Sequence, residues 1–218
     1  MKIGVFGGTF NPVHFGHLRA AEEVREKLQL EKILFVPAKN PPLKIKDLAE
    51  AGHRYEMLRI SIEDNKWFEI SDVEFSYKGK SYTVKTIEIL RREYVNETMY
   101  LIVGIDSFLD LQNWWRPDRL TDIVDFIVMA RPGFSFIELA RSPFIKTDYR
   151  ILKSMDRDKG DMCEIKMLSK RKAILLKVTE LDISSTLIRD YIKIGKSIKY
   201  LLPQEVYSYI IKNKLYKK

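Results

Sequence analysis

Cysteine is nearly absent from this chain, and long apolar runs are missing altogether. Cys163 is the only cysteine among 218 residues, so no disulfide can form within the chain and a reducing compartment is the expected setting. No stretch approaches the length of a membrane span, and the apolar run at residues 2–6 is too short for a signal peptide. We therefore expect a cytoplasmic protein with no membrane partner. Nothing near Cys163 would activate its thiol as a nucleophile.

Acidic side chains are outnumbered, with 30 Asp and Glu against 38 Lys and Arg, which gives a net charge of +8. Such a surplus suits anionic ligands, among them nucleotides, RNA and acidic lipids, without choosing between them. Aromatic and basic side chains are not interleaved in the kind of stripe that binds single-stranded nucleic acid. We therefore expect no nucleic-acid partner, and a basic, solvated surface is a sufficient explanation for any one lysine cluster.

Two common nucleotide-binding motifs are also missing. No G-x-G-x-x-G pattern follows the first apolar run, which excludes the usual dinucleotide-redox fingerprint. Gly79-Lys80-Ser81 resembles the end of a P-loop, but Glu74 stands where the first glycine of that motif belongs. A nucleotide-binding site in this chain would therefore have to use a different motif.

Short apolar runs alternate with segments of helical spacing along the chain. Strands are expected at residues 2–6, 32–36, 99–103, 125–130 and 173–178, with residues 67–75 also extended. Helices are expected at residues 16–29, 54–63, 82–92, 185–194 and 204–213. The alternation predicts a Rossmann-like α/β fold, with a doubly wound, mostly parallel sheet and helices on both faces. We expect a single domain over residues 1–218, with a small helical part at about 184–218, while residues 134–172 give no clear pattern.

Ligands of such sheets bind beyond the carboxyl ends of the strands. The unusual features of this sequence follow its predicted strands. They lie after the first strand, after the second strand, at Gly104-Ile105-Asp106, at Arg131-Pro132-Gly133, and after Val178. Five loops could therefore line one crevice.

The strongest motif follows the first strand and reads Gly7-Gly8-Thr9-Phe10-Asn11-Pro12-Val13-His14-Phe15-Gly16-His17. The glycines, which we expect to form a tight loop, let backbone approach a phosphate, and the next helix presents free N–H groups to an anion. His14 and His17 are three residues apart at the helix start, so both can face one ligand. Two of the three histidines of the chain lie in this motif. An imidazole pair here can donate hydrogen bonds to phosphate oxygens during displacement.

A second motif lies far away in the sequence and reads Ile183-Ser184-Ser185-Thr186-Leu187-Ile188-Arg189. Ser184 or Ser185 can cap the following helix, which is a purely structural role. A functional interpretation adds hydroxyl and backbone N–H donors around a triphosphate, with Arg189 one turn further on as a charge clamp. Alone, the stretch is ambiguous.

Together the two motifs resemble those of the adenylyltransferases of the nucleotidyltransferase superfamily, and most of all the bacterial nicotinate mononucleotide adenylyltransferases. The resemblance extends to nearly the whole chain except about residues 134–172. Its further pieces are Val36-Pro37-Ala38, Pro41-Pro42-x-Lys44, Arg54-x-x-Met57, Gly79-Lys80-Ser81-Tyr82-Thr83, Gly104-x-Asp106-Ser107, Trp114, Arg131-Pro132-Gly133 and a closing set of Leu202-Pro203, Tyr209-Ile210 and Leu215-Tyr216.

The resemblance implies a role for each motif residue. Catalysis is implied for His14, His17, Lys44 and Arg189. ATP binding is implied for Gly7, Gly8, Thr9, Phe10, Gly104, Asp106, Ile183, Ser184, Ser185 and Thr186. Mononucleotide binding is implied for Tyr82, Thr83, Trp114 and Arg131, with Trp114 stacking on the pyridine ring.

Three positions depart from the family pattern. Leu43 stands where the family often has His, so one phosphate-facing donor is lost. Lys85 replaces a frequent Asp and removes any carboxylate role there, whereas Asn11 in place of a frequent Asp is a tolerable change.

The implied reaction is attack of the phosphate of nicotinate mononucleotide on the α-phosphorus of ATP, giving deamido-NAD and pyrophosphate. A phosphate nucleophile is already ionised at neutral pH, so positioning and charge neutralisation carry the rate. Mg²⁺ would arrive with ATP, and no protein metal site is expected. Two alternatives stay open: a sibling enzyme acting on nicotinamide mononucleotide or phosphopantetheine, and an RNA-binding regulator that retains the fold. The sequence also leaves a homo-oligomer open.

The first prediction concerns His17, the more catalytic of the two histidines by resemblance. His17→Ala should lower kcat by orders of magnitude, because a donor aimed at charge that develops in the transition state is lost. Thermal unfolding should change only modestly. Steady-state pyrophosphate release checks this prediction, and near-normal turnover would remove the catalytic assignment.

Overall fold

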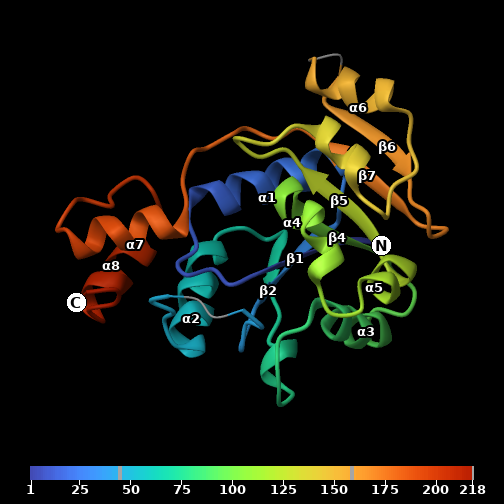
Figure 1. Ribbon diagram of the computed structural model, residues 1–218. Helices are drawn as coiled ribbons and strands as arrows, with labels where there is room; N and C mark the ends of the chain where they lie inside the picture. Colours follow the sequence, from blue (N-terminus) through green and yellow to red (C-terminus); the bar gives the residue numbers. More distant parts are fainter. Residues whose placement is uncertain (44–45, 158–159, 218) are drawn as a thin grey trace.

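A seven-stranded sheet forms the centre of the molecule in a computed structural model that describes residues 1–43, 46–157 and 160–217 (Figure 1). The strand order is β3-β2-β1-β4-β5-β7-β6. All neighbouring strands are parallel except β7 and β6, which are antiparallel. The strands are β1 Lys2–Gly8, β2 Lys32–Pro37, β3 Phe68–Ile70, β4 Thr98–Gly104, β5 Asp125–Met129, β6 Met162–Lys166 and β7 Lys172–Leu176. The predicted Rossmann-like, mostly parallel sheet is confirmed.

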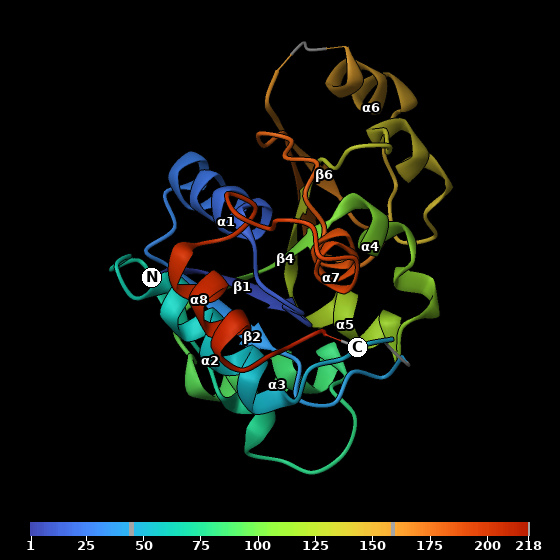
Figure 2. The same ribbon diagram turned by 90° about the vertical axis from the view of Figure 1, so that its left-hand side faces the viewer.

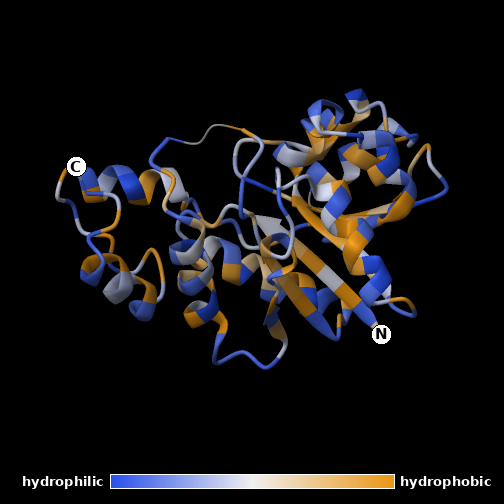
Figure 3. Ribbon diagram, turned by 90° about the horizontal axis from the view of Figure 1, so that it is seen from below, coloured by the Kyte–Doolittle hydropathy of each residue, from blue (hydrophilic) through white to orange (hydrophobic). Residues whose placement is uncertain are grey.

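Helices cover both faces of this sheet, so the strands are buried on both sides. One face carries α1 Phe15–Leu28, α2 Ala51–Ile62, α7 Ser185–Lys193 and α8 Gln204–Lys212. The other face carries α3 Thr83–Glu93, α4 Ile105–Leu109, α5 Pro117–Ile123 and α6 Tyr149–Asp156. Short 3₁₀ turns complete it at η1 Val73–Phe75, η2 Leu111–Asn113 and η3 Phe136–Arg141. Figure 3 shows the strands mostly apolar and the helices divided between apolar and polar residues.

Strand β1 illustrates why the sheet has two cores. Its side chains alternate, so that Ile3 and Val5 join the core beneath α3 to α6, while Phe6 joins the core beneath α1 and α2. Gly4 has no room for a side chain, because an added Cβ would lie 2.7 Å from the Ile102 side chain. The central strand is therefore packed tightly on both faces, which fixes the position of the turn at its carboxyl end.

The direction of the strand order changes at β1. The chain places β2 and β3 on one side of β1, then returns to add β4 on the other side. Crevices for ligands form at such switch points, outside the carboxyl ends of the strands. Here the two strands on either side of the switch point end at Gly8 and Gly104, which are the positions of two predicted motifs.

The last two helices pack on the face that holds α1 and α2. Ile188 of α7, and Val206 and Ile210 of α8, join the core there, and α8 contacts α2. Gly195 follows α7 with a φ of 72°, a conformation that favours glycine at a helix end. Figure 2 shows α7 and α8 near the carboxyl end of the sheet. None of the helices in the described ranges is long and apolar enough to cross a membrane.

The structure corrects four local expectations. Gly7-Gly8, predicted to form a loop, continue β1 because both pair with β2. Residues 67–75, predicted to be extended, form only the short β3 followed by the η1 turn. The uninterpreted stretch 134–172 contains η3, α6 and β6, and helices α4 and α5 were not predicted. The helices among them are short, and β6 lacks the continuous apolar run by which the equally short β5 and β7 were predicted.

Candidate active site

The turn between β1 and α1 places both motif histidines at the start of the helix. His14 is the N-cap residue of α1, and its ring lies 3.8 Å from the ring of His17, centroid to centroid. Phe10, which has a φ of 48°, is buried and contacts the His17 ring edge-on at 5.2 Å. The side chain of Phe10 is therefore part of the core, and only its backbone is available to a nucleotide. Gly7 is open, because an added Cβ would meet nothing within 4 Å.

The start of α7 lies directly against this turn. Ser185 Oγ donates a hydrogen bond of 2.7 Å to the carbonyl oxygen of Pro12. Arg189 Nη1 donates one of 2.9 Å to the carbonyl oxygen of Asn11. Ser184 caps α7 by accepting the N–H of Leu187 at 3.1 Å. The two motifs, more than 170 residues apart in the sequence, therefore form one surface.

Other residues of the second motif surround Arg189. Thr186 is exposed and accepts a hydrogen bond of 3.2 Å from Arg189 Nη2. Ile183 is partly buried, and its carbonyl oxygen lies 3.6 Å from where a Cβ on Gly16 would stand. Arg189 itself is 7% exposed, and its Nε has no hydrogen-bond partner in the described part of the chain. A buried, incompletely bonded guanidinium favours an anionic ligand.

Both motif histidines are neutral at physiological pH. Burial, with a smaller effect of the Arg131 charge, lowers the pKa of His14 to about 4. Burial, followed by the neighbouring His14 and Arg131, also lowers the pKa of His17 well below its usual range. His17 Nδ1 accepts the backbone N–H of His14 at 3.3 Å, so the proton of the neutral ring is on Nε2. His17 is thus a hydrogen-bond donor through Nε2, and the positive charge of the site comes from arginine.

An ion pair joins the loops that follow β4 and β5. Arg131 Nη1 donates to Asp106 Oδ2 at 2.8 Å, at the start of α4. Asp106 Oδ1 is buried without a hydrogen-bond partner in the described ranges. A side chain at Gly104 would displace that oxygen, since an added Cβ would lie only 2.5 Å from it. Asp106 and Arg131 were predicted in different subsites, and the structure brings them together beside the histidines.

Arg54, quoted in the sequence only as part of the resemblance, fastens the loops after β1 and β2 to α2. It is 1% exposed and donates hydrogen bonds of 2.6–3.2 Å only to carbonyl oxygens, those of Thr9, Ala38, Lys39 and Ala49. A sequence signal for this burial exists, because Arg54, Leu58 and Ile62 share one helical stripe. A charged residue on the apolar face of a helix indicates a side chain that is buried and satisfied by hydrogen bonds.

A chain of contacts continues from these loops to the predicted mononucleotide residues. Asn40 and Ser81 exchange two hydrogen bonds of 2.9 Å, which fixes the segment before α3. Tyr82 is the N-cap of α3, which begins at the partly buried Thr83. The Tyr82 ring stacks on Trp115 with centroids 4.7 Å apart.

The two adjacent tryptophans have different surroundings. Trp114, the predicted stacking residue, packs against the core. Trp115 is 46% exposed, and the guanidinium of Arg116 lies 5.0 Å from the centroid of its ring. The structure thus adds Trp115 to the candidate site. Lys44, predicted to reach phosphate, lies outside the described residues.

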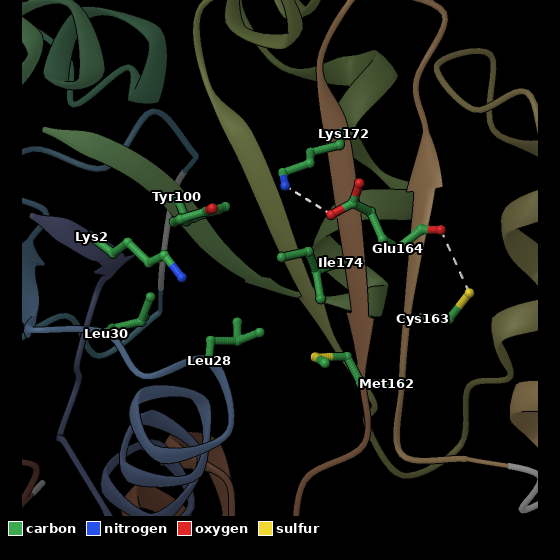
Figure 4. A pocket seen from close by; sticks show the side chains of 9 residues that line it. All are labelled: Lys2, Leu28, Leu30, Tyr100, Met162, Cys163, Glu164, Lys172 and Ile174. Carbon is green, nitrogen blue, oxygen red and sulfur yellow. Dashed lines mark hydrogen bonds and ion pairs between the residues drawn. The ribbon is translucent and has the colours of Figure 1, made fainter.

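A separate cavity of about 230 Å³ is lined by residues of β1, β4, β6 and β7 and by the end of α1 (Figure 4). Its lining includes Lys2 and Lys172, the first residues of β1 and β7, together with Tyr100 near the start of β4. Lys172 is paired there with Glu164 at 2.8 Å. The cavity contains none of the predicted site residues.

The fold and the paired motifs define a nucleotidyltransferase. The chain belongs to the cytidylyltransferase-like family, whose model matches residues 5–191. Within that family it belongs with the nicotinate-nucleotide adenylyltransferases, as the resemblance predicted. Probable enzymes of this name from Desulfitobacterium hafniense (strain Y51) and Syntrophotalea carbinolica are 39% and 41% identical, covering 99% and 100% of this chain and 96% and 98% of theirs.

Solved structures agree on the fold. The nicotinic acid mononucleotide adenylyltransferase of Plasmodium falciparum complexed with NaAD matches with a TM-score of 0.74 at 22% identity, covering 99% of this chain and 97% of that one. The same enzyme complexed with APC matches with a TM-score of 0.72.

Arg54→Met should destabilise the protein by about 2–4 kcal/mol, because several buried carbonyl oxygens would lose their donor. The matched control is Arg59→Met in the same helix. Arg59 is 42% exposed and pairs with Glu56 and Glu63, so its loss should matter much less. Denaturant unfolding compares the two variants, and equal losses would contradict the anchoring role of Arg54.

The lowered pKa of His14 predicts a pH dependence of stability. The unfolded chain takes up a proton near pH 6.5, whereas folded His14 resists protonation until about pH 4. The stability that neutral His14 contributes is therefore present above about pH 6.5 and lost as pH falls toward 4. The wild type should lose about 2–3 kcal/mol more than His14→Asn between pH 7 and pH 4. Parallel unfolding profiles would show that His14 is not protected from protonation.

Proposed function

We propose that this enzyme transfers AMP from ATP to nicotinate mononucleotide, giving deamido-NAD and pyrophosphate for NAD biosynthesis. The acceptor is suggested by the names of its relatives. The observation that carries the ATP site is the contact of the His-bearing turn with α7, through Ser185 and Arg189. This contact brings neutral hydrogen-bond donors and the Arg189 guanidinium together at the switch point of the sheet.

The geometry supports direct displacement at the α-phosphorus. The acceptor phosphate is ionised and needs no strong base, so the residues act by holding both substrates and neutralising charge. His17 Nε2–H would donate to the reacting phosphate, while Arg189 and the open backbone at Gly7 would hold the triphosphate. Because the histidines are neutral before ATP binds, arginine and the proposed Lys44 would supply the positive charge.

The acceptor subsite would lie beside the start of α3. Thr83 and its backbone N–H stand at the first turn of that helix, where negative charge is favoured. The Tyr82–Trp115 stack and the neighbouring Trp114 offer flat surfaces suited to a pyridine ring. Arg131, which lies beside Asp106, would face the phosphate of the mononucleotide.

Mg²⁺ would enter with ATP, held mainly by phosphate oxygens and water. The described ranges contain no group of three or more His, Cys, Asp or Glu side chains that could hold a metal by themselves. Asp106 Oδ1, a buried oxygen without a hydrogen-bond partner in those ranges, is suited to this cation directly or through water. Bound there, the ion would neutralise phosphate charge. We place the enzyme in the cytoplasm, in keeping with its single cysteine.

A pyrophosphate-release assay with ATP and Mg²⁺ tests the acceptor. We expect kcat/KM for nicotinate mononucleotide to exceed that for nicotinamide mononucleotide by on the order of 10- to 100-fold. Phosphopantetheine should give no turnover above background. A preference for the amide would replace the proposed acceptor, and salt-sensitive RNA binding without any pyrophosphate release would replace the proposed function.

A further inference from the structure

Asn11 connects four segments of the protein at the edge of the candidate site. Its side chain is 3% exposed. Nδ2 donates to the carbonyl oxygen of Asp47 at 3.1 Å, and Oδ1 accepts the N–H of Ala49 at 3.0 Å. Its own carbonyl oxygen accepts Arg189 Nη1. The orientation of Asn11 therefore fixes the turn that leads to His14 and the place where Arg189 docks.

The fourth segment is the end of the chain. Tyr216 donates a hydrogen bond of 3.0 Å from its hydroxyl to Asn11 Oδ1, across 205 residues of sequence. The φ of 52° at Lys214 closes the end of α8, where the N–H of Leu215 donates to the carbonyl oxygen of Ile210 at 3.1 Å, and Tyr216 itself has a φ of 62°. Non-glycine residues adopt this region at a cost of about 1 kcal/mol or more, which persists only where other contacts require it. At Tyr216 these contacts include its packing against the core and its hydrogen bond to Asn11.

The Tyr216 hydroxyl lies in the field of both buried arginines. Burial raises the pKa of Tyr216 well above its usual range, while the nearby Arg189 and Arg54 oppose that rise. The hydroxyl thus stays protonated and donates to Asn11. Both guanidiniums bond to the same turn, at Thr9 and Asn11, so Tyr216 completes a set of three side chains that hold it.

We propose that Tyr216 is a positioning residue for the triphosphate site, acting through Asn11 on the turn that carries His14 and receives Arg189. Its kinetic consequence rests on the proposed function. In the described part of the chain the Tyr216 hydroxyl bonds to Asn11 and to no predicted site residue. Its effect should therefore fall on ATP, whose site the turn forms, and not on the mononucleotide, whose predicted residues lie near α3.

The test compares Tyr216→Phe with Tyr209→Phe. Tyr209 lies in α8, packs against the same core, and bonds through its hydroxyl to His53 of α2 at 2.9 Å, away from the turn. Each variant loses one hydroxyl from the C-terminal part. Tyr216→Phe should raise KM for ATP about fivefold, the effect of one hydrogen bond, with KM for the mononucleotide unchanged. Tyr209→Phe should leave both unchanged, while the two melting temperatures fall by similar amounts.

A double-mutant cycle with Asn11→Ala identifies the route. Tyr216→Phe should add little to the ATP defect of Asn11→Ala, because the hydroxyl acts only through that side chain. Additive defects, or equal KM values for ATP in Tyr216→Phe and Tyr209→Phe, would overturn the proposal and leave Tyr216 as a structural anchor.

Amide hydrogen exchange without ligand separates this proposal from the proposed function. The N–H of Ala49, held by Asn11 Oδ1, should exchange faster in Tyr216→Phe than in Tyr209→Phe. If the wild type releases no pyrophosphate with any acceptor, the proposed function fails, and this comparison still decides whether Tyr216 holds Asn11. Equal exchange in the two variants would show that it does not.

Discussion

The contact between the β1–α1 turn and the start of α7 is the interaction on which the rest of the site depends. Two hydrogen bonds, from Ser185 Oγ to Pro12 and from Arg189 Nη1 to Asn11, join segments from opposite ends of the chain. The packed central strand holds one partner in place, and the apolar face of α7 holds the other through Ile188. Because both partners are anchored by core packing, the polar surface between them is formed before any ligand arrives.

The charges of the site suit a polyanion. Arg54 and Arg189 are both buried beside the turn, and neither has a carboxylate within ion-pairing distance in the described ranges. Their hydrogen bonds go to carbonyl and hydroxyl oxygens, and the carboxylates that act on them, Glu74 on Arg54 and Asp47 on Arg189, do so from beyond ion-pairing distance. Burial, followed by the charge of the nearby Arg131, lowers the pKa values of both histidines and keeps them neutral. A nucleoside triphosphate would supply the missing negative charge, so ligand binding and charge balance are linked at this edge of the sheet.

The sequence predicted those parts of the fold whose signals are local. Apolar runs located β1, β2, β4, β5 and β7, and helical spacing located the long helices, so the sheet type followed. The meeting of the two motifs rested on resemblance, and the structure places them in contact. The helices between residues 105 and 156 escaped because they are short, and β6 escaped because it has no continuous apolar run. The roles of Asn11, Trp115 and Tyr216 depend on contacts between distant segments, which no local pattern reveals; Arg54 alone carried a readable signal, its place on an apolar helical stripe.

The most direct test of a shared ATP site is a hydrogen-exchange footprint of the wild type with and without ATP and Mg²⁺. If the turn and α7 form one site, peptides covering residues 9–17 and 183–189 should both gain protection, with the same dependence on ATP concentration. Protection of only one segment, or of neither at saturating ATP, would contradict the account.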